Sequence, residues 1–162
     1  QPAAFCGCVG FKPSYGRVSR YGLGAYSSSL DQIGVLSQNV EDAALLYDAI
    51  AGYDEKDSTS ANVPYEKTAP NLNSERKFTI AIIENYIEQC SDEVKNALKK
   101  SVEMLKAQGH KIVSKSLQDS KFDIAAYYII ATAEASANLS RYDGVRYGRR
   151  SENKGYVYQF AQ

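Results

Sequence analysis

The stretch Phe78-Thr79-Ile80-Ala81-Ile82-Ile83 decides the fold class of this chain. It is short, apolar and rich in β-branched side chains, as is typical of a β-strand buried on both faces. We therefore predict a strand over 78–83.

A helix and a second strand follow this run. Ser91 is a good N-cap residue, Asp92 and Glu93 complement the dipole of the first turn, and Gly109 ends the helical pattern. The predicted buried stripe is Val94, Leu98, Val102 and Leu105. A second strand over 111–117 completes a β-α-β unit at about 78–117, whose strands pair in parallel. The fold class is therefore α/β, with a mixed β-sheet flanked by helices.

Upstream of this unit, the chain divides into three segments. Residues 1–38 are rich in Gly and Ser and lack a periodic pattern, which favours tight turns near a functional site. Residues 39–52 are predicted to form a helix, with Asn39 as N-cap and Gly52 as the stop. Its apolar face comprises Val40, Ala43, Ala44, Tyr47, Ile50 and Ala51. Residues 53–77 collect Pro, Ser, Thr, Asn and Asp, and predict a surface connection with a short helical turn.

Downstream of the unit, residues from Phe122 to about Arg141 predict another helix. Its expected enclosed stripe is Ala125, Tyr128, Ile129, Thr132, Ser136 and Leu139. We assign 78–150 to a strand-helix-strand-helix unit, and leave the tail 151–162 without a predicted element. Together these segments make 1–162 one partial domain, and both ends of the sequence have the appearance of cuts.

Composition argues against several classes of protein. Nineteen Lys and Arg balance nineteen Asp and Glu, so the chain has no large net field to attract nucleic acid or an anionic membrane. No stretch approaches the roughly 20 apolar residues of a membrane span, which predicts a soluble protein. Three cysteines are an odd number, and Cys6 and Cys8 are too close for an easy disulfide. We expect three reduced thiols in a cytoplasmic protein, and no metal site.

The usual catalytic constellations are largely missing. The single histidine, His110, directly follows the predicted helix stop, where a Ser-His or Cys-His arrangement is poorly placed. No phosphate-binding glycine loop is present, so the residues support no cofactor in this chain. A basic, aromatic segment does stand out as a candidate RNA contact, although such clusters are also ordinary surface. It contains Arg141, Arg146, Tyr147, Arg149, Arg150, Lys154, Tyr156 and Tyr158.

Several long motifs, in order along the chain, resemble the amidase signature family. They are Gln1-Pro2-Ala3-Ala4-Phe5-Cys6-Gly7, Gly10-Phe11-Lys12-Pro13-Ser14-Tyr15-Gly16-Arg17-Val18-Ser19, Ser29-Leu30-Asp31-Gln32-Ile33-Gly34 and Asn39-Val40-Glu41-Asp42-Ala43-Ala44. Within that family, Tyr127-Tyr128 and the run Glu134-Ala135-Ser136-Ala137-Asn138-Leu139-Ser140-Arg141-Tyr142-Asp143-Gly144-Val145-Arg146-Tyr147-Gly148 are similar to the A subunits of tRNA-dependent amidotransferases. The resemblance covers residues 1 to about 150. Val35 departs from it, because the family often has Pro there, and the match fades beyond Arg150.

The resemblance implies where the chemistry lies. In the family, a serine nucleophile is activated by a second serine, held by a cis peptide bond, and by a lysine that desolvation keeps neutral. The pattern places all three before residue 1, with the nucleophile just upstream of Gln1, so no serine of this chain inherits the catalytic role. We therefore expect the 162-residue chain alone to be inactive.

The resemblance also implies two groups of site residues. Gln1, Pro2 and Ala3 would support the backbone behind the nucleophile as a short helix or turn, with Pro2 at a first helical position, although simple packing explains them equally well. One tyrosine of Tyr127-Tyr128 would hold glutamine. We favour Tyr127, since adjacent helical residues point about 100° apart and Tyr128 fits the predicted apolar stripe.

The implied function is glutamine hydrolysis that supplies ammonia for converting Glu-tRNA(Gln) into Gln-tRNA(Gln). The implied partners are the B and C subunits. ATP and Mg²⁺ would be bound by one of these partners, and tRNA would be contacted mainly through it. Two alternatives stay open: a free-standing amidase acting on another small amide, and a non-catalytic interaction module on the same scaffold. Glu-tRNA and Asp-tRNA substrates are not distinguished.

Overall fold

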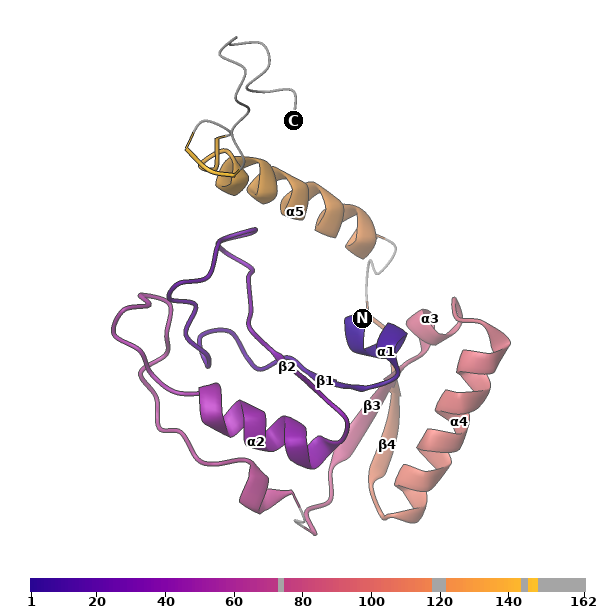
Figure 1. Ribbon diagram of the computed structural model, residues 1–162. Helices are drawn as coiled ribbons and strands as arrows, with labels where there is room; N and C mark the ends of the chain where they lie inside the picture. The colour runs from indigo at the N-terminus through magenta and orange to yellow at the C-terminus, as the bar shows by residue number, and fades with distance from the viewer. Residues whose placement is uncertain (73–74, 118–121, 144–145, 149–162) are drawn as a thin grey trace. The chain divides into compact units, whose positions relative to one another are not determined.

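The computed structural model describes residues 1–72, 75–117, 122–143 and 146–148. The chain separates into two compact units, one comprising Gln1–Leu72 with Ile129–Gln162 and the other Asn73–Tyr128. The break after Leu72 falls inside the segment predicted as a surface connection. Each unit is described in turn, with elements labelled as in Figure 1.

The unit Asn73–Tyr128 contains the predicted β-α-β arrangement. Strand β3 (Thr79–Ile83) leads through the short helix α3 (Glu84–Ile87) into helix α4 (Asp92–Ala107), and strand β4 (Lys111–Lys115) returns. The strands pair in parallel with Ile80 opposite Ile112, and α4 runs alongside them (Figure 1). The prediction from the run at 78–83 is confirmed in both element type and pairing.

The expectation that β3 is buried on both faces is wrong. Thr79 and Ala81 are exposed, whereas Ile80, Ile82 and Ile83 are half-buried. Within the described residues this sheet has two strands. In the predicted stripe of α4, Leu98, Val102 and Leu105 are half-buried, while Val94 is exposed. Successive side chains of a strand point to opposite faces of the sheet, so a strand that is covered on one face only alternates between half-buried and exposed residues.

The other unit is built around a small antiparallel pair. Strands β1 (Val9–Phe11) and β2 (Val35–Ser37) pair with Gly10 opposite Leu36, and helix α2 (Val40–Ile50) packs on them. Its buried cluster is Val18, Val35, Ala43 and Tyr47. The Tyr47 ring meets that of Phe11 edge-on at 5.0 Å. Val35, the departure from the family pattern, is thus a core residue. The described strands form two separate pairs rather than one mixed sheet.

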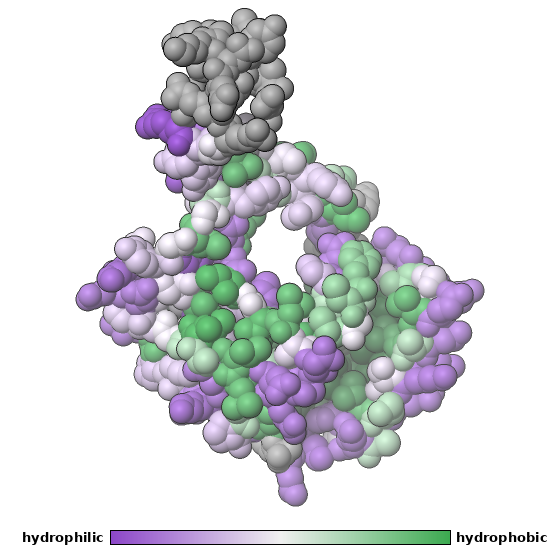
Figure 2. Space-filling view, viewed as in Figure 1, coloured by the Kyte–Doolittle hydropathy of each residue, from purple (hydrophilic) through white to green (hydrophobic). Residues whose placement is uncertain are grey.

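Helix α2 begins as predicted. The Asn39 side chain accepts a hydrogen bond from the Asp42 N–H at 2.8 Å, which satisfies one of the free amides of the first turn. The helix ends at Ile50, with extended Ala51 rather than Gly52 as its C-cap. Val40 and Ile50 are exposed, contrary to the predicted stripe, and Figure 2 shows apolar side chains gathered over α2.

The connection after α2 contains the predicted helical turn, η1 (Ala69–Asn71). The Asp48 carboxylate holds it by accepting hydrogen bonds from the Thr68 and Ala69 N–H groups, at 2.7 and 3.0 Å, and from the Tyr65 hydroxyl. Burial raises the pKa of Asp48, but these hydrogen bonds outweigh burial and lower it to about 2.

Helix α5 (Asp123–Leu139) matches the predicted span but not the predicted face. Its buried residues are Ala131, Ala135 and Asn138, whereas Tyr128, Ile129 and Thr132 are exposed. The enclosed stripe is therefore rotated from the one expected from apolar content. No helix in the described part of the chain has the length and apolar character of a membrane span. Cys6, Cys8 and Cys90 form no disulfide within the described residues.

Candidate functional site

The three residues predicted to support the site lie together in one pocket. Gln1, Pro2 and Ala3 line a cavity of about 370 Å³. Its other walls come from β1, β2 and the loop before β2, through Gly10, Phe11, Lys12, Gln32, Gly34, Val35 and Leu36. The structure therefore brings residues from both ends of the Gly/Ser-rich segment to one place.

Helix α1 (Pro2–Cys6) gives this pocket its first wall. Pro2 occupies the first turn, where its missing N–H removes no hydrogen bond. Gly7 ends the helix in the left-handed conformation, with φ 63°, and its N–H bonds to the Ala3 carbonyl. A Cβ at Gly10 would lie 2.6 Å from the Cβ of Ala3, so α1 approaches β1 at a distance that only glycine permits.

Gln32 is a polar residue among those that line the same pocket. Its Nε2 donates to the Ile33 carbonyl at 3.0 Å. Its Oε1 is buried and accepts no hydrogen bond from the described residues. A buried amide oxygen in this state has unused capacity to accept a hydrogen bond. Gln32 lies in the family motif at 29–34, but the sequence alone predicted no role for it.

Sequence reasoning also missed a polar cluster around the loop 26–31. The Asp31 carboxylate accepts hydrogen bonds from the N–H groups of Tyr26, at 2.9 Å, and Ser27, at 3.1 Å. Arg20 donates to the Ser28 carbonyl at 2.7 Å and to the Asp31 carbonyl at 3.2 Å. The Asp31 carboxylate and the Arg20 guanidinium therefore both stabilise the conformation of this loop.

Glu134 of α5 fixes the same loop from another direction. Its Oε2 accepts from the Ser27 hydroxyl at 2.7 Å and from the Ser29 N–H at 3.1 Å, and its Oε1 accepts from the Ser29 hydroxyl. Hydrogen bonds from Ser27 and Ser29 lower the pKa of Glu134. No pattern in the sequence paired residues so distant along the chain.

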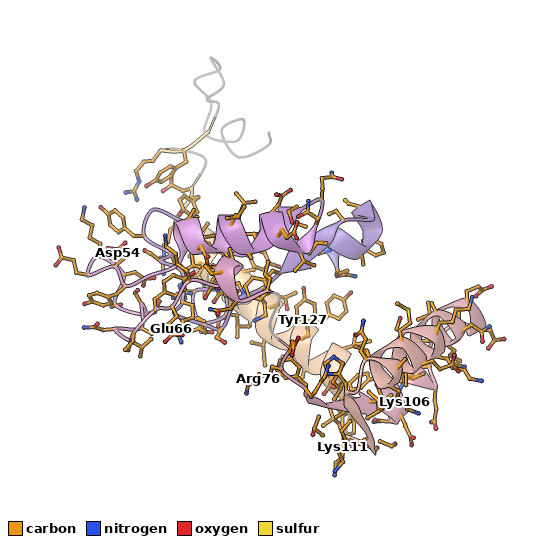
Figure 3. All side chains as sticks on the ribbon, turned by 90° about the horizontal axis from the view of Figure 1, so that it is seen from below. Asp54, Glu66, Arg76, Lys106, Lys111 and Tyr127 are labelled. Atoms are coloured by element: carbon orange, nitrogen blue, oxygen red, sulfur yellow. The ribbon has the colours of Figure 1, made fainter. Side chains whose placement is uncertain are left out.

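The two tyrosines predicted to bind substrate lie near the start of α5. Both are 61% exposed, and their ring centroids are 5.3 Å apart. Figure 3 shows Tyr127 on this helix. The exposure of Tyr128 removes one reason for favouring Tyr127, because Tyr128 is not in an apolar core. Both tyrosines belong to the unit Asn73–Tyr128, whereas the pocket belongs to the other unit.

His110 and Arg146, two further sequence candidates, have structural partners. His110 Nδ1 accepts a hydrogen bond at 3.2 Å from the N–H of Phe78, the residue just before β3. Arg146 of the basic segment pairs with Asp143 at 3.2 Å. Arg149, Arg150, Lys154, Tyr156 and Tyr158 lie outside the described residues. Among the described residues, no group of three or more His, Cys, Asp or Glu side chains is arranged to hold a metal ion.

Comparisons with known proteins support the sequence motifs. The chain is 79% identical over 153 residues to the A subunit of glutamyl-tRNA(Gln) amidotransferase from Campylobacter jejuni subsp. doylei, covering 94% of this chain and 34% of that protein. It therefore spans about a third of the length of the curated relatives it matches.

Solved structures give the same picture. The crystal structure of the A subunit of glutamyl-tRNA(Gln) amidotransferase from Thermotoga maritima matches 98% of this chain and 33% of its own, with 34% identity and a TM-score of 0.73. An amidase family protein from Bacillus anthracis matches 86% of this chain and 28% of its own, with 25% identity and a TM-score of 0.66. The amidase family model matches residues 1–161. The chain therefore belongs to the amidase family.

Proposed function

We propose that this chain is part of the glutamine-hydrolysing subunit of a tRNA-dependent amidotransferase that forms Gln-tRNA(Gln) from Glu-tRNA(Gln). The observation that carries the proposal is 79% identity, over 94% of the chain, to a protein named as the A subunit of glutamyl-tRNA(Gln) amidotransferase. A match of 153 residues in a chain of 162 includes the tyrosine pair of α5.

In this proposal, the residues of the chain hold and orient while the reacting groups lie upstream. Gln1, Pro2 and Ala3 support the backbone that follows the nucleophilic serine, and the tight contact of α1 with Gly10 keeps that backbone in place. Tyr127 places its hydroxyl for a hydrogen bond to glutamine. A fixed support of this kind contributes to catalysis by removing reorganisation during the reaction.

The activity of the whole protein depends on partners in this proposal. The B and C subunits receive the ammonia, and one of them binds ATP and Mg²⁺, which activate the carboxyl group of the misacylated Glu-tRNA. That partner makes most of the contacts with tRNA, and the complex works in the cytoplasm. The 162-residue chain releases no ammonia by itself in this proposal, because the two serines and the lysine of the family's mechanism match positions upstream of Gln1.

A second candidate is a free-standing amidase that hydrolyses another small amide. The match to the Bacillus anthracis amidase family protein favours it, because the same fold is found there. The two candidates differ in what they bind. An amidotransferase component requires partner subunits, whereas a free-standing amidase or a non-catalytic module does not need them for its role.

The experiment uses a tagged protein that contains this sequence and has the full length of the curated relatives. It is purified from the organism that produces it, and the purified material is assayed for formation of Gln-tRNA(Gln). We expect two partner subunits to co-purify, and the complex to convert Glu-tRNA(Gln) when glutamine, ATP and Mg²⁺ are supplied. A protein that purifies alone and hydrolyses small amides at full rate would favour the second candidate. A protein that purifies alone and hydrolyses none would favour the non-catalytic module.

A further inference from the structure

We propose that one end of the β-α-β unit binds the phosphate backbone of tRNA. This basic end lies where β3 and β4 begin and α4 ends, and it consists of Arg76, Lys77, Phe78, Lys106, His110 and Lys111. All six residues belong to the unit Asn73–Tyr128. The inference rests on the proposed function, which supplies the tRNA, and it adds a contact from this chain to those of the partner subunit.

The turn between α4 and β4 brings these residues to one surface. The Gly109 N–H donates to the Lys106 carbonyl at 2.9 Å, and a Cβ at Gly109 would lie 3.5 Å from Lys77 Cε. The Lys111 N–H donates to the Phe78 carbonyl at 2.9 Å, which joins the starts of the two strands. Figure 3 labels three of the cations at this end of the unit, namely Arg76, Lys106 and Lys111. The basic end therefore combines side chains from both strand starts and from the helix.

The four cations of the basic end have no acidic partners. All four are exposed, and within the described residues none of them forms an ion pair. The acidic residues nearest to them in sequence are Glu75 and Glu103, which are exposed as well. Because the whole chain has zero formal net charge, the basic end is a local concentration of positive charge. A nucleic acid that binds to such a surface releases condensed counterions, and this release favours binding.

The same charges limit what can cover the basic end in a protein of the relatives' length. The chain spans 34% of the length of such a relative. Burying four unpaired cations beneath another part of that protein would cost a large desolvation free energy. We therefore expect the basic end to face solvent, where an anionic partner reaches it.

Aromatic rings among the cations favour RNA over an acidic protein segment. The Arg76 guanidinium lies 5.2 Å from the centroid of the Phe78 ring, and the His110 ring lies 5.8 Å from the same ring. Phe78 is 49% exposed. Exposed rings and guanidinium planes stack on unpaired bases, while neighbouring cations follow the phosphate backbone. An acidic protein segment would pair with the cations alone, so the combination fits an RNA with unpaired bases, such as tRNA.

The test measures the Kd for a tRNA(Gln) transcript at several salt concentrations. It uses a protein that contains this sequence at the length of the curated relatives, assembled with its partner subunits. Lys106 also complements the negative end of the α4 dipole, so the variant combines Lys77→Gln with Lys111→Gln. We expect Kd to rise about tenfold, and the slope of log Kd against log salt concentration to fall by about two, because two phosphate contacts are lost.

A second pair of lysines in the same unit gives the matched control. Lys100, in the middle of α4, and Lys115, at the far end of β4, are both exposed. Lys100→Gln combined with Lys115→Gln removes the same net charge from outside the basic end. We expect its Kd to stay within about twofold of the parent and its salt slope to be unchanged. Equal effects of the two double variants would overturn the proposal, since net charge rather than this surface would then determine binding.

Phe78 provides a measurement that does not depend on charge. Phe78→Leu removes the ring and retains an apolar side chain, and we expect Kd to rise about tenfold with an unchanged salt slope, because stacking releases no counterions. Phe78→Tyr keeps the ring and should restore the Kd of the parent, which separates lost stacking from a folding defect. An unchanged Kd for Phe78→Leu would overturn the base-stacking role.

Two further readouts distinguish the remaining explanations. If Lys77→Gln with Lys111→Gln weakens the binding of poly-glutamate but leaves the Kd for tRNA(Gln) unchanged, the surface binds acidic protein and the RNA assignment is wrong. Lowered thermal stability with an unchanged Kd for tRNA(Gln) would also overturn the proposal, because the lysines would then pair with another part of the protein. Failure of the parent complex to form Gln-tRNA(Gln) contradicts the proposed function, and the comparison of Kd values detects the basic end independently of that activity.

Discussion

At the scale of single residues, carboxylates organise the irregular parts of this chain. Asp48 accepts hydrogen bonds from the N–H groups of Thr68 and Ala69, at the start of η1. Asp57 accepts from the N–H groups of Arg20, at 2.7 Å, and Thr59. Glu134 accepts hydrogen bonds from the loop 26–31. Loops of this kind have few hydrogen bonds of their own, so side-chain acceptors replace the ladder of a helix or sheet. The acidic residues here thus act as structural acceptors.

Asp48→Asn tests this role through the pH dependence of stability. The pKa of Asp48 is about 2 in the folded protein and 3.8 as the ordinary value, so its contribution is complete above pH 4 and is lost as the pH falls toward 2. We expect Asp48→Asn to lower Tm by several degrees at pH 7 and by less at pH 2.5. Thermal melts at the two pH values measure this difference, and an equal decrease at both would contradict it.

Tyr127 and Tyr128 give the residue-scale prediction for substrate binding. If the Tyr127 hydroxyl bonds to glutamine, Tyr127→Phe raises the KM for glutamine about tenfold, since one hydrogen bond is lost. Tyr128→Phe is the matched control, and we expect its KM to stay within about twofold of the parent, because a phenyl ring retains the packing. Steady-state ammonia release measures both variants, and the reverse order of effects would assign the role to Tyr128.

At the scale of elements, local signals decide where helices begin. The Asn39 side chain accepts from the Asp42 N–H, which is a contact within one turn. We expect Asn39→Ala to cost about 1 kcal/mol of unfolding free energy. Asn39→Asp retains the acceptor and should cost little. Chemical denaturation of the three proteins measures the difference, and an unchanged midpoint for Asn39→Ala would show that the cap contributes nothing.

The contact between α1 and β1 gives a second element-scale prediction. A methyl group at Gly10 would meet Ala3 at 2.6 Å and would displace α1 from β1. We expect Gly10→Ala to reduce kcat/KM for glutamine at least tenfold, because a shift of the support behind the nucleophile misaligns the reacting groups. Gly24→Ala is the control, since its nearest contact is an ordinary 3.7 Å. Equal activity of the two variants would contradict this role of α1.

The sequence predicted where helices and strands form better than it predicted which face of each is buried. Caps, acidic first turns and β-branched runs act within a few residues, so α2, α4, α5, β3 and β4 are found close to where they were expected. The face that α5 buries depends instead on Glu134 contacting Ser27, which lies 107 positions earlier. Apolar content alone favoured Tyr128 and Ile129, which are exposed. Long-range polar contacts of this kind leave no periodic signal.

At the scale of the whole molecule, the family resemblance predicted site residues that local sequence patterns did not indicate. Gln1, Pro2 and Ala3 have no distinctive chemistry, yet they line one pocket with Gln32 and Gly34. The contacts of Glu134 and Gln32 could not be predicted from the motifs that contain them, because these contacts depend on the tertiary fold. The substrate role of Tyr127 stays a prediction from the resemblance.

Ammonia release from glutamine by two proteins is the sharpest test of the proposed function. One is the 162-residue chain, and the other is a protein of the relatives' length that carries the same sequence and is assembled with its partner subunits. We expect the longer protein to hydrolyse glutamine in preference to other small amides, and the 162-residue chain to hydrolyse none. Hydrolysis of glutamine by the 162-residue chain, or failure of the assembled protein to release ammonia from glutamine, would contradict it.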